Sequence, residues 1–364
     1  MFRKKKTLLL LLVAALFCLM IAEIWKGKEK PFETFLRPFV NVEKSDKYAQ
    51  RQRETVAKTD KELAIPRGDF SEVSLSGTGG RISVGRSADA EVRLRYTIAA
   101  HAAGEATAVR KRDAIRVEQA AESGRLTLKA TANGKRPDSD DIVIDYELLV
   151  PDGMNVRIDS ENATVRVEGT VGDAAVSGVA ELVEIVGVQG DVSATSDYGN
   201  VYISGITGNV TLVNLAADAN VTDIRGNVAI DNESGRNFVG RVEGKVSGVT
   251  HGGPVYAREI DGSVELDSRN ADLQLEDVRG DVRVEAVNGK TTLILPADAG
   301  YALNAYTNGG RFRTTLPIPV ESAGKGEYAL RGIVGDGKWR AEVTSRSGNI
   351  VIYTNEEHNG RVTP

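Results

Sequence analysis

The sequence has few of the residues from which metal centres and disulfide frameworks are built. Its 364 residues include one cysteine and three histidines, with 2 Trp and 8 Phe. Cys18 has no partner within the chain, and three histidines with one cysteine are too few for a His/Cys metal site. These shortages argue against thiol redox chemistry, a zinc enzyme and a disulfide scaffold. We therefore expect no metal and no cofactor.

Long apolar runs are also scarce over most of the chain, and the charges are unevenly distributed along it. A hydrophobic share of 41% with 27% charged residues excludes a disordered chain and a multispanning membrane protein. Residues 1–69 hold 15 basic and 9 acidic side chains, whereas residues 70–364 hold 31 basic and 42 acidic ones. The acidic part repels polyanions, so a nucleic-acid partner is disfavoured.

The one long apolar run lies at the N-terminus. Residues 1–6 form a basic tail, and residues 7–25 are long enough, at about 28 Å, to span a membrane as one helix. Ala22 is the obvious cleavage point, but Met20 occupies the −3 position, where signal peptidases need a small residue. We expect an uncleaved single-pass anchor in the cell membrane with the ectodomain outside, and keep a cleaved signal peptide as the alternative. Residues 26–69 predict a polar tether.

The middle of the chain is an 18-residue repeat. A glycine is preceded two positions earlier by Val or Ile and followed two positions later by Val, at Gly190, Gly208, Gly226, Gly244, Gly262 and Gly280. The same pattern occurs at Gly169, which precedes Gly190 by more than one period and so predicts a three-residue insertion in the first coil. A second series of Gly and Ala lies half a period further on, so each unit has two half-turns.

Alternating polarity within each half-turn predicts half-buried strands. Two inward columns of the first half-turn begin at Val192 and Ala194, and one of the second half-turn begins at Ile203. The outward column of the second half-turn comprises Tyr202, Asn220, Phe238, Tyr256, Gln274 and Thr292. Such strands bury a face only by stacking, with glycine at the corners. The prediction is an all-β fold: a flattened, single-stranded β-solenoid with 18-residue coils after an N-terminal transmembrane helix.

The flanking segments predict antiparallel β caps that close the two open ends of the solenoid. We expect an N-terminal cap over residues 70–150, solenoid repeats over 151–299, a C-terminal cap over 300–355 and a tail over 356–364. Six strand-like stretches lie irregularly in the first cap, from Glu72 to Val150.

The pattern resembles the bacterial family of extracytoplasmic β-strand-repeat proteins that are classed as adhesins of unknown function. The resemblance rests on the strand from Asp145 to Pro151 that leads into the repeats, on the glycine-punctuated repeats, and on the closing segment from Thr344 to Ile350. It covers about residues 70–355. It implies an anchored or secreted envelope protein, in some members associated with envelope-stress regulation, and it implies no catalytic residues.

Two kinds of chemistry are disfavoured in the repeats. Calcium β-rolls need a continuous array of oxygen ligands, and Lys245 interrupts the corner column of Asp and Asn; hydrogen bonds of these side chains to their own turns are the simpler interpretation. Polysaccharide-cleaving solenoids carry paired carboxylates. Asp223, Glu259 and Asp277 share a column, but Arg241 between them favours a charge-neutral ladder. We expect no catalytic and no metal-binding residues.

The aromatic column is the best binding candidate. Tyr202, Phe238 and Tyr256, with Tyr198 nearby, offer ring faces on which a sugar or a protein could stack. The structural alternative is lateral stacking between coils beneath a cap. His101, His251 and His358 are scattered and are taken as surface residues.

Three functions follow, in order of preference. The first is a noncatalytic, envelope-anchored, adhesin-like protein that presents its solenoid to a cell-wall, polysaccharide or protein partner. The second is a carbohydrate-active enzyme on the same scaffold. The third is a structural module that self-associates end to end or edge to edge.

Overall fold

The structure, a computed structural model, describes residues 55–355. The predicted anchor, most of the tether and the tail lie outside this range. The chain divides into a larger unit, Ala57–Ala100 with Val109–Pro364, and a smaller one that includes His101–Ala108. Within residues 55–355, no helix is both long and apolar enough to cross a membrane.

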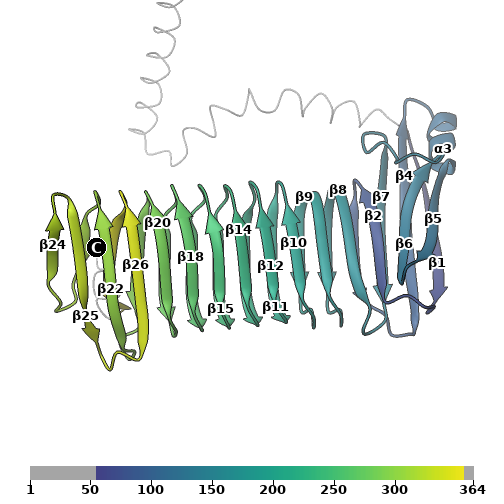
Figure 1. Cartoon of the computed structure of the whole chain (residues 1–364). Helices are drawn as coiled ribbons and strands as arrows, with labels where there is room; N and C mark the ends of the chain where they lie inside the picture. The colour runs from purple at the N-terminus through teal and green to yellow at the C-terminus, as the bar shows by residue number, and fades with distance from the viewer. Residues whose placement is uncertain (1–54, 356–364) are drawn as a thin grey trace, which may run out of the picture. The chain divides into compact units, whose positions relative to one another are not determined.

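The described residues are almost entirely β-structure, and the middle of the chain is a stack of two-stranded rungs. Figure 1 shows these strands side by side in one row. One face of the stack, called face A, contains β10 (Val192–Ser196), β12 (Val210–Asn214), β14 (Val228–Asn232), β16 (Val246–Thr250), β18 (Val264–Arg269) and β20 (Val282–Val287). The other, face B, contains β11 (Asn200–Thr207), β13 (Asp218–Arg225), β15 (Asn237–Glu243), β17 (Val255–Asp261), β19 (Leu273–Val278) and β21 (Lys290–Leu295).

The 18-residue period is confirmed by the strand register. Neighbouring rungs are parallel, and each residue pairs with its equivalent one period on, such as Val192 with Val210 and Ile203 with Val221. The three predicted inward columns are buried, apart from the half-buried Gly248. Thr292 was predicted to face outward, but it is 5% exposed, because β21 is buried on both sides.

The predicted three-residue insertion is wrong. The long strands β8 (Asn155–Glu168) and β9 (Ala174–Val186) contribute to both faces, and they pair with the same offset as the later rungs, as Val156 does with Ala174. The glycine in the position of Gly190 is therefore Gly172, over which Gly190 packs. Thr170 and Ala174 take the inward positions that Val188 and Val192 take one rung later.

The N-terminal segment adds rungs as well as a cap. β2 (Glu72–Thr78) and β3 (Arg81–Arg86) pair in parallel with β8, and β6 (Arg125–Ala132) and β7 (Ile142–Val150) pair in parallel with β2 and β3. Beyond these lie β4 (Glu91–Ala102) and β5 (Ile115–Glu122), which are antiparallel to β7 and β6. A helix that the sequence did not predict, α3 (Glu105–Asp113), separates β4 from β5.

The C-terminal segment repeats this arrangement in reverse order. β26 (Trp339–Arg346) and β27 (Asn349–Thr354) pair directly with β20 and β21. β22 (Tyr301–Asn308) and β23 (Phe312–Thr314), although earlier in the chain, lie beyond them. β25 (Glu327–Val334) and β24 (Val320–Gly324) then complete an antiparallel edge. The last strands of the chain thus fill a place inside the stack, between rungs that precede them in sequence.

Part of the predicted tether is a strand. β1 (Thr55–Pro66) pairs with β4 at the edge of the sheet. Thr97 of β4 donates a hydrogen bond to Asp60 at 2.7 Å, and Arg95 lies 3.5 Å from Glu62. An edge strand pairs with a neighbour through its backbone on one side only. Its charged side chains therefore do not prevent β1 from pairing with β4.

Corner Asp and Asn side chains connect successive rungs. The backbone N–H of Asp191 donates to the Asp173 carboxylate at 2.8 Å, that of Asn209 to Asp191 at 2.7 Å, and that of Asn227 to Asn209 at 3.0 Å. The expectation that these side chains bond their own turns is therefore wrong. Their oxygens satisfy the corner N–H groups of the next rung, which the parallel strand pairing leaves unpaired.

Candidate functional site

The aromatic side chains lie in one column on the outer side of face B. Register pairs Tyr202 with Asn220, Asn220 with Phe238, Phe238 with Tyr256, and Tyr256 with Gln274. Since adjacent strands are about 4.8 Å apart, Phe238 and Tyr256 are direct neighbours, and Tyr202 lies about 9.6 Å from Phe238. The column runs along the axis of the stack.

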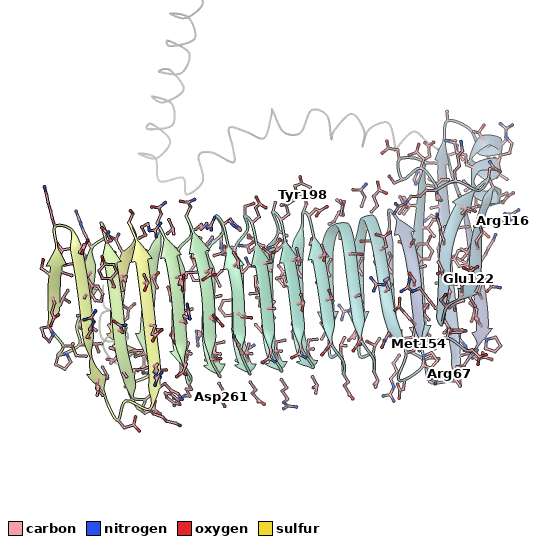
Figure 2. The ribbon with its side chains drawn as sticks, viewed as in Figure 1. Arg67, Arg116, Glu122, Met154, Tyr198 and Asp261 are labelled. Atoms are coloured by element: carbon pink, nitrogen blue, oxygen red, sulfur yellow. The ribbon has the colours of Figure 1, made fainter. Side chains whose placement is uncertain are left out.

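The four aromatic side chains differ in exposure. Tyr202 is 46% exposed and Tyr198 59% exposed, whereas Phe238 and Tyr256 are half-buried. Tyr198 lies outside the column, at the edge of the stack where the chain turns from face A to face B, and Figure 2 shows Asp261 at the opposite edge.

Phe238 lies against the sheet surface because Gly240, two positions along the same strand, has no side chain. A Cβ atom on Gly240 would come within 3.0 Å of the Phe238 ring. The ring therefore lies over the Gly240 position and stays half-buried. The role of Gly240 was not predicted from the sequence, although a glycine two residues after an outward aromatic in a strand was a usable signal.

The column itself carries no charge between Tyr202 and Gln274. Asn220 is exposed and Gln274 half-buried. One amide thus lies between Tyr202 and Phe238, and the other follows Tyr256. The outward residues of the next column, Arg258 and Glu276, bring both charges nearby. Rings with amides between them can stack against the apolar faces of a ligand while hydrogen-bonding its hydroxyl groups.

A second column, at the other end of the face B strands, contains the acidic residues that were considered for catalysis. Asp223, Arg241, Glu259 and Asp277 follow one another at successive rungs, and all four have positive φ, from 49° to 59°. Gly169, Gly187 and Gly205 occupy the same column in the preceding rungs. Arg and Glu seldom adopt this conformation, which costs about 1–2 kcal/mol per residue.

The carboxylates of this column take part in ion pairs with arginine side chains. Arg241 holds Asp223 through two hydrogen bonds, of 2.7 and 2.8 Å, and this contact holds the pKa of Asp223 below its usual value. Glu259 pairs with Arg258 at 2.6 Å, and Asp277 lies 3.4 Å from Arg279. A general acid of a glycosidase needs a raised pKa, so the state of Asp223 is the opposite of that requirement. The charge-neutral ladder expected from Arg241 is present at Asp223.

Two of the three histidines lie within residues 55–355. His251 is exposed, and His101 is half-buried rather than on the surface. His358 lies outside the described residues.

The chain was compared with curated proteins, with solved structures and with protein families. No curated protein matches the sequence. Solved structures to which the chain is similar include a candidate cell adhesion protein from Clostridium sporogenes, with 10% identity, TM-score 0.22, and coverage of 82% of this chain and 100% of that one. A candidate adhesin from Bacteroides fragilis has 14% identity, TM-score 0.29 and coverage of 82% and 97%. One from Parabacteroides merdae has 10% identity, TM-score 0.31 and coverage of 81% and 95%.

These superpositions are too weak to transfer any property between the proteins. The sequence match to a family is extensive, however, because it covers residues 40–353 of the chain. That range includes every rung of the stack and both of its ends. The protein belongs to the Toastrack DUF4097 family.

Proposed function

We propose that the protein is a noncatalytic, adhesin-like component of the cell envelope that binds a polysaccharide chain along face B. The observation that carries this proposal is the column of Tyr202, Asn220, Phe238, Tyr256 and Gln274, in which rings and amides follow the axis of the stack. An extended polymer laid along this axis meets a ring or a side-chain amide at each of these five rungs. Many weak contacts of this kind add up to useful affinity.

The proposed location rests on the sequence. Residues 7–25 provide the predicted single-pass anchor, and the tether would hold the stack outside the membrane. The alternative of a carbohydrate-active enzyme gains no support from the acidic column, because Arg241 occupies Asp223.

Replacement of Tyr202, Phe238 and Tyr256 together by serine is expected to weaken binding at least a hundredfold. Each lost aromatic anchor removes on the order of 1–2 kcal/mol from an interface. The free energy of unfolding should fall by only about 1–2 kcal/mol, mainly because removal of the Phe238 ring exposes the Gly240 backbone. Pull-down of the full chain with insoluble envelope polysaccharide measures the first quantity, and thermal unfolding the second.

The matched control is Tyr328→Ser. This tyrosine of β25 is 37% exposed and belongs to the terminal hairpin, far along the chain from the column. Binding should be unchanged in the control. A triple variant that binds as well as the wild type, or that loses most of its stability, would end the proposal. Release of reducing ends from the polysaccharide would instead indicate an enzyme.

A further inference from the structure

The outward column of face B is limited at both ends. Before Tyr202 the same column contains Glu184, which is paired with Arg166 at 2.9 Å. After Gln274 it contains Thr292, which is 5% exposed and so offers almost no surface to a ligand. Between these limits each rung presents one uncharged outward residue, and the distance from Tyr202 to Gln274 is about 19 Å.

The spacing of the rungs suits one kind of polymer. Parallel strands repeat about every 4.8 Å, and the register places one side chain of the column on each rung. Sugars joined by β-1,4 linkages form an extended chain in which each unit advances by a similar length. Chains with α-1,4 linkages coil instead, so their units do not stay in step with the rungs. A β-1,4-linked chain therefore keeps about one unit over each rung.

The surface beside the column is uncharged over its first three rungs. The next outward residues along the strands are Ser204, Thr222 and Gly240, and Arg258 and Glu276 follow only at the last two rungs. Hydroxyl and amide groups both donate and accept hydrogen bonds, as the hydroxyl groups of a sugar do. This part of face B therefore matches the hydrogen-bonding chemistry of an uncharged sugar chain.

The basic side chains beside the column each have a carboxylate next to them. Arg258 pairs with Glu259 at 2.6 Å. Arg236, on the other side of the column, has Asp218 one rung away, and this carboxylate accepts the backbone N–H of Arg236 at 2.8 Å. Asp272, two periods after Arg236, adds a further negative charge on the same side. A polyanion laid along the column would meet these carboxylates, whose repulsion opposes binding.

We infer that the ligand of face B is an uncharged, extended polysaccharide with β-1,4 linkages, and that about five of its sugar units lie along the column, one on each rung. This rests on the proposed function, to which it adds the charge, the linkage and the length of the bound segment. The charge follows from the carboxylates beside the column, and the linkage from the rung spacing. The length follows from the limits at Glu184 and Thr292.

The length is tested with two series of β-1,4-linked oligosaccharides, one of glucose and one of N-acetylglucosamine, from two to about eight units long. Calorimetric titration of the full chain, in a detergent without sugar groups, measures the Kd of each. In at least one series, the Kd should fall about threefold to tenfold with each added unit up to about five units, and should then level off. A Kd that is independent of length, or that falls at the same rate through eight units, would overturn the inference.

Glu184→Gln tests where the column ends. Arg166 keeps a second partner, Glu168, at 3.0 Å, so the substitution does not leave this arginine unpaired. The uncharged column gains one rung, and the length at which the Kd levels off should rise from about five to about six units. The matched control is Asp267→Asn on the outer side of face A, which should leave that length unchanged. An unchanged length in Glu184→Gln would contradict the limit assigned to Glu184.

The charge and the linkage are tested with oligosaccharides of five units. Carboxymethylated forms of the two series keep the β-1,4 backbone and add carboxylates. They should bind at least about tenfold more weakly than the uncharged forms at low salt, and the difference should shrink as salt is added. The α-1,4-linked glucose oligosaccharide should also bind at least about tenfold more weakly. Equal or tighter binding of the carboxymethylated or the α-linked forms would overturn the inference.

The pull-down with insoluble envelope polysaccharide separates this inference from the proposed function. We expect the wild type to bind that polysaccharide and also at least one uncharged series. A wild type that does not bind the envelope polysaccharide would show that the proposed function is wrong. If the wild type binds it through Tyr202, Phe238 and Tyr256 but binds neither uncharged series, the proposed function stands and the inference about the ligand is wrong.

Discussion

A single alanine inserted between Ala229 and Ile230 is expected to lower the free energy of unfolding by about 3–5 kcal/mol. The insertion moves Ile230 from the inward to the outward side of β14, because side chains alternate along a strand. Ile230 is 4% exposed and Asn232 is fully buried, so an apolar contact and a buried amide are both displaced. The neighbouring rungs β12 and β16 hold their register through backbone hydrogen bonds and oppose any accommodation.

Chemical denaturation measures this loss. The matched control is an alanine inserted between Asp89 and Ala90, in the exposed loop between β3 and β4. Surface loops tolerate added residues at little cost, so the control should unfold within about 0.5 kcal/mol of the wild type. Similar denaturation midpoints for both insertions would contradict the stacked-rung architecture.

Gly226→Ala is expected to cost about 3–5 kcal/mol, unusually much for one added methyl group. Gly226 has φ of 150°, and a Cβ atom there would lie 2.2 Å from the carbonyl oxygen of Gly208 in the preceding rung. The same close approach recurs at Gly208 over Gly190 and at Gly244 over Gly226. The added atom either separates the rungs at this corner or distorts the backbone. Either change disturbs the packing of the neighbouring rungs.

Gly205→Ala is the control for this substitution. Gly205 also has positive φ, 69°, but its Cβ atom would meet nothing closer than 3.6 Å. Asp223 and Arg241 carry side chains in the same column and conformation. The control should therefore cost only about 1–2 kcal/mol, the conformational strain of one residue. Equal losses for the two variants in thermal unfolding would show that conformation, and not the close packing of rungs, explains the glycines.

The regular part of the fold was predictable because one period governs it. The Val192 column and the 18-residue spacing give the strands, the inward side chains and the register without any further information. The first coil was misaligned because Thr170 and Ala174 occupy inward positions that Val fills elsewhere. A polar and a small residue there weakened the repeat, and the similar pattern around Gly169 was mistaken for it.

The ends of the stack were less predictable because their pairing is non-local. Glu72 pairs with Asn155, and Val282 pairs with Ala341. Nothing in the local pattern of β26 shows that it belongs between β20 and β22. The helix α3 gave no signal because EATAVRKRD lacks an apolar stripe; only Ala108 is buried.

The residues of the candidate site could be predicted from the sequence, but the exposure of each side chain could not. Period and alternation placed Tyr202, Phe238 and Tyr256 in one outward column. Their exposure depends on features that alternation does not report. Phe238 is half-buried because Gly240 lets its ring lie flat, and Thr292 at the end of the column is buried because β21 is covered on both sides.

Hydroxyl-radical footprinting of the full chain, with and without isolated envelope polysaccharide, tests most directly whether face B binds a polymer. The polysaccharide is expected to protect Tyr202, Phe238 and Tyr256 from oxidation. Val213 and Val249 on face A should react equally in both states. Protection confined to face A or to the two ends of the stack, with the face B aromatics oxidised as before, would contradict it.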